Sequence, residues 1–242
     1  AQLVTGEIVT YGKQFSVAIS FDTADSSKSK IYVDGVSQTL ATNTVNNIVC
    51  EIDMNYVNIG RNRRNANHWL TGSLGELYFN NTYTDLATEN PFWDSDTNRP
   101  NSVRKVIEDT GVTPAIAMPM MGHEAGNNLG SGGDFTVNSG PYAGARGGSE
   151  FWARGADFNG SSWLSKSMSL PSTKTASLVM AVNFDSLSAQ VEMFAIKTNT
   201  TNHAILFKRS AAGQISFVTY YQPNSFPGVE MTDTTSMSTG NT

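Results

Sequence analysis

The stretch Phe15-Ser-Val-Ala-Ile-Ser-Phe21 decides the fold class, because an apolar side chain stands at every second position. Successive side chains of a β-strand point to opposite faces of a sheet, so this alternation predicts a strand with one face in a core and the other in solvent. Further along, Asp34-Gly35 stands between two apolar runs and supplies the backbone freedom that a tight hairpin turn needs. The N-terminal part of the chain therefore predicts an antiparallel meander.

Similar apolar runs recur along the chain and predict further strands at 30–33, 36–40, 48–59, 69–79, 156–158, 178–184, 191–196, 204–208 and 215–220. Only one segment has helical spacing: Val103, Val106 and Ile107 predict a helix over 101–109, which Gly111 is placed to end. Prolines and glycines interrupt the region 80–148 and predict a connector with little regular structure. The expected fold class is all-β, an antiparallel β-sandwich with a Gly/Pro-rich connector that carries one short helix.

The composition limits the function classes. Apolar residues make up 39% of the chain, enough for a substantial core, while a formal net charge of −5 and a pI near 5.2 argue against a nucleic-acid partner. The single cysteine cannot form an internal disulfide, and the histidines have no metal-ligand spacing. No apolar run approaches the roughly 18 residues of a membrane helix. We therefore expect no nucleic acid, no membrane insertion, no metal and no cofactor.

Several phrases carry a resemblance to a known fold family. KIYVDGV (30–36), VNIG (57–60) and WLTGSLGELYF (69–79) resemble the second half of a laminin-G-like, concanavalin A-like jelly roll. ADFNGSSWL (156–164), with the alternating run that follows it, resembles the first half of the same domain. The resemblance implies a chain ordered as second half (1–80), connector (81–148) and first half (149–242).

The connector resembles a segment that follows such domains in structural proteins of tailed bacteriophages. The similarity lies in residues 86–107 and in GSGGDFTVN (130–138), and it lapses at TPAIAMP (113–119), where that segment has a glycine-rich phrase. It implies a non-enzymatic structural protein of the virion, an extracellular particle: a fibre, spike or decoration protein. Such a protein would assemble with other virion proteins and could adhere to host surface glycans. A secreted bacterial glycan-binding adhesion module is an alternative.

A half sandwich leaves sheet edges unpaired, and such edges tend to pair with other chains. Three arrangements would complete it: pairing of 1–80 with 149–242 in one chain, pairing with a neighbouring copy, or pairing within a longer tandem array. The need to cover edges predicts a symmetric homo-oligomer.

The phrase CEIDMNY (50–56) nearly matches the E-x-D-x-E run of laminarinase-type retaining glycosidases, which suggests a hydrolase with Glu51 and Asp53 in its site. A retaining glycosidase needs two carboxyl groups, and Asn55 stands where the second would be. We therefore expect no enzyme. The simpler interpretation is a strand with a β-bulge near Tyr56 and Val57. Its core-facing residues would be Ile48, Cys50, Ile52, Met54 and Tyr56.

The loop RNRRNANHW (61–69) gathers cationic, amide and aromatic side chains. Such a set could bind an anionic sugar or a phosphate through forked guanidinium contacts, while the amides contact hydroxyls. The alternative is a solvated loop with its tryptophan turned into the core. The candidate ligand-binding residues are Arg61, Arg63, Arg64, His68 and Trp69.

The turn that carries Asp22 and Asp25 is a further candidate, for a calcium site. Calcium takes six or more oxygens from converging loops, and two carboxylates on one turn do not supply them. An ordinary solvated turn is expected there.

Overall fold

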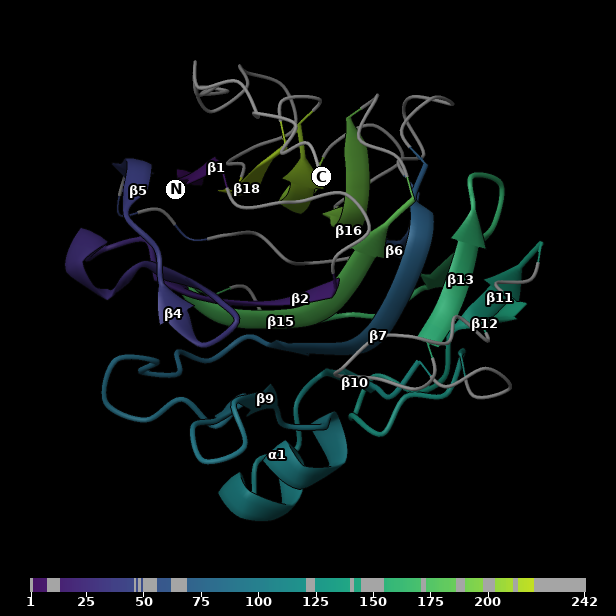
Figure 1. Cartoon of the computed structure of the whole chain (residues 1–242), viewed down its shortest axis with the longest axis horizontal. Coiled ribbons are helices and arrows are strands. Elements are labelled where there is room, and N and C mark those ends of the chain that lie inside the picture. Colours follow the sequence, from purple (N-terminus) through teal and green to yellow (C-terminus); the bar gives the residue numbers. More distant parts are fainter. Residues whose placement is uncertain are drawn as a thin grey trace, which may run out of the picture.

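The computed structural model describes residues 2–7, 14–45, 47, 49, 56–61, 69–120, 125–139, 142–144, 155–170, 173–185, 190–197, 203–210 and 213–219. Two eight-stranded sheets, here called A and B, face each other across a shared core (Figure 1). All their strand pairs are antiparallel. The predicted all-β sandwich is therefore confirmed, whereas the concanavalin A-like jelly-roll form stays a prediction.

The strands follow each other across each sheet in an order that differs from their order in sequence. Sheet A runs β11 (Thr136–Asn138), β14 (Trp163–Lys166), β6 (Tyr56–Ile59), β16 (Val191–Lys197), β17 (His203–Arg209), β18 (Gln214–Thr219), β1 (Gln2–Glu7) and β5 (Leu40–Thr44). Sheet B runs β12 (Tyr142–Gly144), β13 (Gly155–Asn159), β7 (Thr71–Asn80), β15 (Thr175–Phe184), β2 (Gln14–Asp22), β3 (Lys30–Val33) and β4 (Val36–Ser37), and β10 (Ile116–Met118) also pairs with β7.

Strands from the two ends of the chain are direct neighbours in both sheets. In sheet B, β2 lies between β3 and β15, and β15 lies between β2 and β7. In sheet A, β6 lies between β14 and β16, and β1 pairs with β18. The segments 1–80 and 149–242 thus pair with each other inside one chain, the first of the three expected arrangements. Their identity as two halves of a laminin-G-like domain stays a prediction.

The alternating apolar residues of β2 point between the sheets, as predicted. Phe15, Val17, Ile19 and Phe21 are all buried in the shared core. The ring of Phe21 lies 4.8 Å from that of Phe217 on sheet A, so the contact joins the two layers. A leucine or phenylalanine buried in this way stabilises the fold by roughly 1.5–3 kcal/mol.

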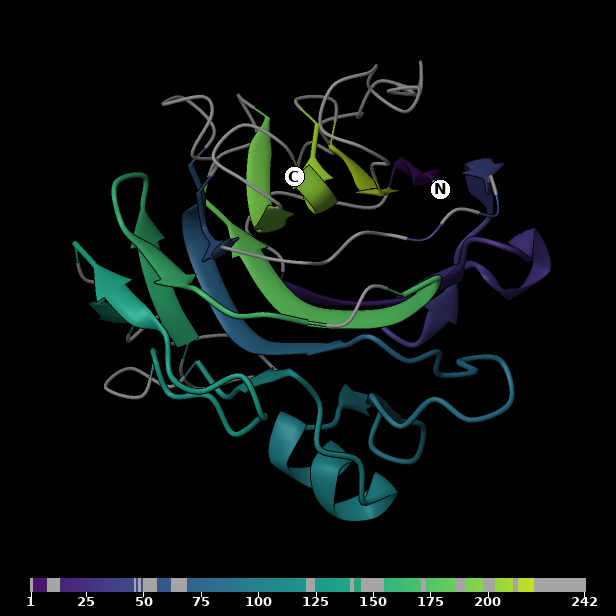
Figure 2. The same ribbon diagram turned by 180° about the vertical axis from the view of Figure 1, so that it is seen from behind.

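The expectation of a solvated outer face on β2 is wrong. Ser16, Ala18 and Ser20 are also buried, because the connector packs against the outside of sheet B. Leu86, Phe92, Val103, Val106 and Ala117 form a second core with Ala18, Tyr78 and Val179 of the sheet. Seen from both sides, the connector forms a third layer along sheet B (Figure 1, Figure 2).

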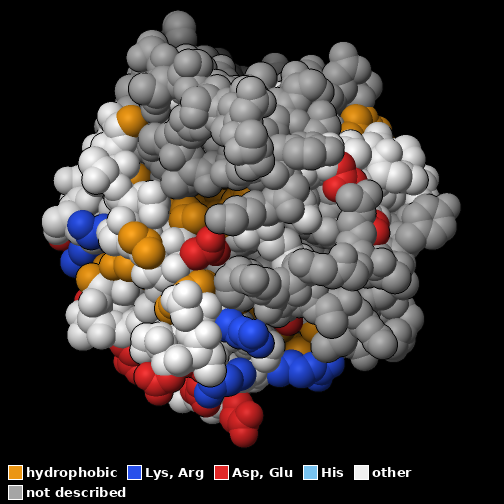
Figure 3. Space-filling view, viewed as in Figure 1, with side chains coloured by type: hydrophobic (Ala, Val, Ile, Leu, Met, Phe, Trp, Pro, Cys, Tyr) orange, Lys and Arg blue, Asp and Glu red, His pale blue; other side chains and the backbone are white. Residues whose placement is uncertain are grey.

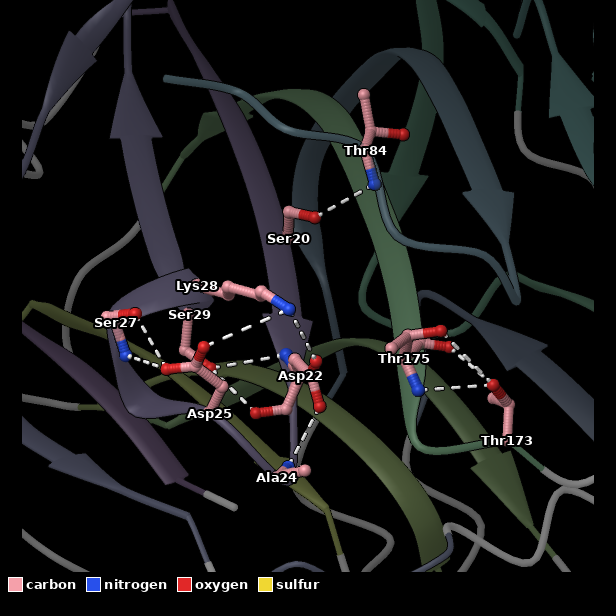
Figure 4. Close-up of polar contacts among 10 residues, drawn as sticks. All are labelled: Ser20, Asp22, Ala24, Asp25, Ser27, Lys28, Ser29, Thr84, Thr173 and Thr175. Carbon is pink, nitrogen blue, oxygen red and sulfur yellow. Dashed lines mark hydrogen bonds and ion pairs between the residues drawn. The ribbon is translucent and has the colours of Figure 1, made fainter. Parts of the chain in front are cut away.

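The connector also has more regular structure than its prolines and glycines suggest. It contributes β10 and β12 to sheet B and β11 to sheet A, and it holds the two-residue strands β8 (Trp93–Asp94) and β9 (Arg99–Pro100). Two hydroxyl groups of sheet B hold the start of the connector. Ser20 Oγ and Ser177 Oγ lie 3.1 Å apart, and both accept the backbone N–H of Thr84 (Figure 4 shows the bond from Thr84 to Ser20).

The predicted helix is confirmed as α1 (Val103–Thr110). Ser102 Oγ accepts the backbone N–H of Lys105 and caps its start, and Gly111 ends it with a left-handed φ of 65°. The first helical N–H, that of Val103, donates to Glu76 Oε2 on β7 at 3.1 Å, which ties the helix to sheet B. Charged side chains of both signs cover the α1 end of the molecule (Figure 3).

The predicted hairpin is present. Asp34 and Gly35 have φ values of 48° and 74°, the two positive φ angles of a type I′ turn, and they join β3 to β4. Three of the four edge strands are short: β4 has two residues and β11 and β12 have three each, whereas β5 has five. Short edges pair poorly with other chains, so among the described strands the edge argument applies chiefly to β5, and the homo-oligomer stays a prediction.

Candidate functional site

Arg61, which follows β6 of sheet A, lies between two tryptophans: Trp69, just before β7 of sheet B, and Trp163 in β14 of sheet A. The guanidinium carbon of Arg61 is 4.5 Å from the ring centre of Trp69 and 4.2 Å from that of Trp163. The two indole rings meet edge to face, with 5.5 Å between their centres. All three side chains are half-buried. We call these three residues the Arg–Trp cluster.

Backbone contacts bring the three segments of the cluster together. Gly60 turns the chain after β6 with a φ of 80°, and a Cβ atom there would lie 2.4 Å from the ring of Phe158. Leu70 N–H donates to Gly60 O at 2.9 Å, and Gly160 N–H donates to Leu70 O at 3.1 Å. A β-bridge joins Arg61 to Trp69, so the stacking rests on a fixed backbone frame.

The cluster combines a cation with flat apolar surface. A guanidinium over an aromatic face is stabilised by roughly 0.5–2 kcal/mol, depending on how far it is desolvated. Its planar N–H groups suit carboxylates and phosphates, while indole rings suit the apolar faces of sugars. The chemistry present is therefore recognition of an anionic or sugar-like group. A nucleophile or a proton-transfer pair is not part of the three residues.

The structure brings two of the five predicted ligand residues together, Arg61 and Trp69, and Trp69 is not turned fully into the core. Arg63, Arg64 and His68 lie outside the described residues. The residue types in 61–69 did not predict Trp163, which belongs to β14, far along the chain. The phrase ADFNGSSWL contains this tryptophan, but nothing in one sequence places it beside residue 61.

The glycosidase-like phrase lies almost wholly outside the described residues, and Glu51, Asp53 and Asn55 are among those not described. Its last residue corrects one expectation: Tyr56 is 37% exposed, whereas Val57 and Ile59 are fully buried in the core. The pairing of β6 with β16 runs without a shift across Tyr56–Val57, so the expected bulge is not at that bond. Tyr56 therefore belongs to the outer face of sheet A.

The turn with Asp22 and Asp25 is a capped surface turn (Figure 4). Asp25 accepts the backbone and hydroxyl groups of Ser27 at the start of the short helix η1 (Ser26–Lys28), and these bonds lower the pKa of its carboxyl group. Lys28 Nζ lies 3.6 Å from Asp22 Oδ2 and 3.9 Å from Asp25 Oδ2. The carboxylates face a lysine and the N–H groups of the turn, an arrangement that disfavours a bound cation.

The described residues also bear on metal binding and on membrane spanning. No three or more His, Cys, Asp and Glu side chains gather there in a way that could hold a metal ion. In the same part of the chain, no helix combines the length and apolarity required to span a membrane.

The resemblance to laminin-G-like domains rests on short phrases and on the sandwich architecture. No protein-family model, no curated protein and no solved structure matches the chain.

Proposed function

We propose that the chain is a non-enzymatic structural component of a virion, a fibre, spike or decoration protein of a tailed phage or related particle, that attaches to anionic surface glycans. Support for the virion assignment comes from the resemblance of its phrases to phage structural proteins. Support for adhesion comes from one observation, the Arg61 guanidinium held between Trp69 and Trp163. The stretch of sequence between Arg61 and Trp69 contains two more arginines and a histidine.

The double stacking fixes the direction of the guanidinium before a ligand arrives. Side-chain ordering is one of the costs of binding, and a group that is already ordered avoids most of it. The two indoles come from distant parts of the chain: Trp69 lies in the bridge with Arg61, and Trp163 lies in β14. A ligand at the cluster would therefore contact segments from both ends of the chain. This arrangement favours recognition of a charged sugar over a purely structural role for each tryptophan.

Removing one indole tests the adhesion proposal. Trp163→Ala is expected to lower the affinity for a sialylated oligosaccharide at least about tenfold, equivalent to about 1.4 kcal/mol, because Arg61 loses one stacking face and the ligand loses contact area. Titration calorimetry against the sialylated oligosaccharide and its uncharged counterpart measures the change. Preference for the charged sugar is the expected wild-type result.

Trp93→Ala serves as the matched control, because Trp93 is also half-buried but lies on β8, where it packs against Gly35. This variant is expected to bind as the wild type does. Equal losses in the two variants would show a general effect on folding. A wild-type chain that binds no charged glycan would remove the adhesion proposal.

The virion assignment has its own test. Antibodies against the chain should label purified particles from the source, and genes for capsid or tail proteins should lie beside its gene. Labelling of the bacterial surface alone, with no particle genes nearby, would favour the secreted adhesion module. Turnover of a β-glucan that disappears in Glu51→Gln would favour the laminarinase-like hydrolase.

A further inference from the structure

The turn between β13 of sheet B and β14 of sheet A adjoins the Arg–Trp cluster. It begins at Asn159, which ends β13 and pairs with Thr71 of β7, two residues after Trp69. A backbone hydrogen bond of 3.1 Å ties the turn to the residue that follows Trp69, and Trp163 begins β14. The turn therefore contacts the segment of one indole and leads directly into the strand of the other.

Asn159 and Trp69 lie on the same side of sheet B. Leu70 is fully buried in the shared core, so alternation turns its neighbours Trp69 and Thr71 to the outer face. Directly paired residues point to the same face, which places Asn159 there with Thr71. Diagonal neighbours on paired strands are about 7–8 Å apart, within reach of an aromatic side chain. One ligand can therefore contact both the amide of Asn159 and the indole of Trp69.

The side-chain amide of Asn159 has a fixed direction. Its Oδ1 accepts three hydrogen bonds inside the turn, from Ser161 N–H at 2.9 Å, from Ser161 Oγ–H at 2.8 Å and from Ser162 N–H at 3.1 Å. A rotated amide would direct its own N–H groups at these donors, so Nδ2 occupies the other position. Asn159 is exposed, and among the described residues no acceptor is hydrogen-bonded to Nδ2. The amide thus presents N–H donors to solvent in a preorganised direction.

The donors of Asn159 and Arg61 suit different groups of one ligand. A guanidinium binds a carboxylate through paired N–H groups, whereas a neutral amide N–H donates well to a hydroxyl or carbonyl oxygen. Indole rings add contact with the apolar face of a sugar ring. An acidic sugar offers all three: a carboxylate, neutral acceptor oxygens and an apolar ring face.

We propose that Asn159 is a further ligand-binding residue of the site, whose Nδ2 donates to a hydroxyl or carbonyl oxygen of the acidic sugar that the Arg–Trp cluster binds. This inference rests on the proposed adhesion function. The site then recognises two features of the sugar, its negative charge through Arg61 and a neutral oxygen through Asn159.

Two substitutions test the proposal, because serine and aspartate can both accept hydrogen bonds of the turn. Asn159→Ser removes the amide donors without a change in charge and is expected to lower the affinity for the sialylated oligosaccharide about fivefold. Asn159→Asp also places a second carboxylate beside that of the ligand, and a loss of at least about 30-fold is expected. Titration calorimetry measures both affinities, and thermal unfolding checks that each variant keeps the Tm of the wild type.

Asn90→Asp is the matched control. Asn90 Oδ1 also accepts a backbone N–H two residues along the chain, that of Phe92 at 3.2 Å. It lines a small crevice with Gly35 of the β3–β4 hairpin, on the opposite side of sheet B from β13. The variant has the same change in charge as Asn159→Asp and is expected to bind as the wild type does.

The outcomes distinguish this inference from the adhesion proposal. Binding that is weakened by Trp163→Ala but unchanged in Asn159→Ser would refute the role of Asn159 and leave the adhesion proposal standing. A loss in Asn159→Asp alone would assign the effect to charge and would also refute the hydrogen bond. If Asn159→Ser does not fold, wild-type affinity in Asn159→Asp, which keeps all three acceptor contacts, would overturn the inference. A wild-type chain that binds no charged glycan would refute both proposals.

Discussion

Gly72→Ala is expected to lower the free energy of unfolding by more than about 3 kcal/mol, the largest effect we anticipate for a single added methyl group in this chain. Gly72 lies in β7, where it pairs with Phe158 of β13 on one side and Phe184 of β15 on the other. Its φ is 145°, a conformation that residues with a Cβ atom rarely adopt. An added Cβ would lie 2.0 Å from the backbone oxygen of Asn183.

The atom that an added Cβ at Gly72 would meet belongs to the backbone of Asn183, so it cannot move aside as a flexible side chain would. To relieve this clash, β7 and β15 would have to separate beside Leu74 and Phe184, which are buried in the shared core. Urea unfolding followed by tryptophan fluorescence measures the loss as a shift in midpoint at constant m. Loss of the folded state altogether would also agree with the expectation.

Gly111→Ala is the matched control for this prediction. Gly111 also has a positive φ, 65°, but no atom lies within 4 Å of the position of an added Cβ. Only the conformational cost at the end of α1 remains, about 1 kcal/mol. If the two substitutions cost the same, the close approach of β7 and β15 would be refuted as the reason for glycine at position 72.

The two strands at the centre of sheet B show what the sequence could predict. Phe15 to Phe21 and Leu178 to Phe184 have apolar residues at every second position, and those residues do face the core. The hairpin at Asp34-Gly35 and the helix that ends at Gly111 were also predictable, because both depend on backbone conformations with few acceptable residues.

The third layer could not be predicted in this way. Ser16, Ala18 and Ser20 are small and mostly polar, as on a solvated face, yet small side chains are also what lets the connector approach the sheet closely. Only the long-range contacts distinguish the two cases. Ser20, for example, meets Ser177 and the backbone of Thr84, neither of which is near it in sequence.

The Arg–Trp cluster was predictable only in part, for the same reason. Arg61 and Trp69 are close in sequence and could be proposed together from their residue types. Trp163 joins them through the pairing of β14 with β6, which aligns Leu164 with Ile59. Local patterns do not encode which distant strands become neighbours, so a site formed between the two ends of the chain stays incomplete at the level of sequence.

A pH-dependent loss of stability is expected from Glu76, the second large effect. Glu76 is 8% exposed beneath α1, and burial raises the pKa of its carboxyl group from 4.5 to about 8, although the N–H of Val103 and the charge of Arg104 act in the opposite direction. Between these two pH values the folded chain keeps a proton that the unfolded chain has released. The free energy of unfolding therefore falls as pH rises, by up to about 1.4 kcal/mol per pH unit, and the fall ends above about pH 8.

Glu76→Gln separates this carboxyl group from all others, because the glutamine oxygen can still accept the N–H of Val103 while the side chain no longer titrates. The variant is expected to lack the downward slope and to exceed the wild type in stability by roughly 3–5 kcal/mol near pH 8, with little difference near pH 5. Urea unfolding across this range measures both curves. Glu108→Gln, an exposed change on the same helix, should reproduce the wild-type slope. Parallel curves for the wild type and Glu76→Gln would mean that the carboxylate is already ionised under α1, where the first helical N–H and Arg104 would then outweigh the cost of its burial.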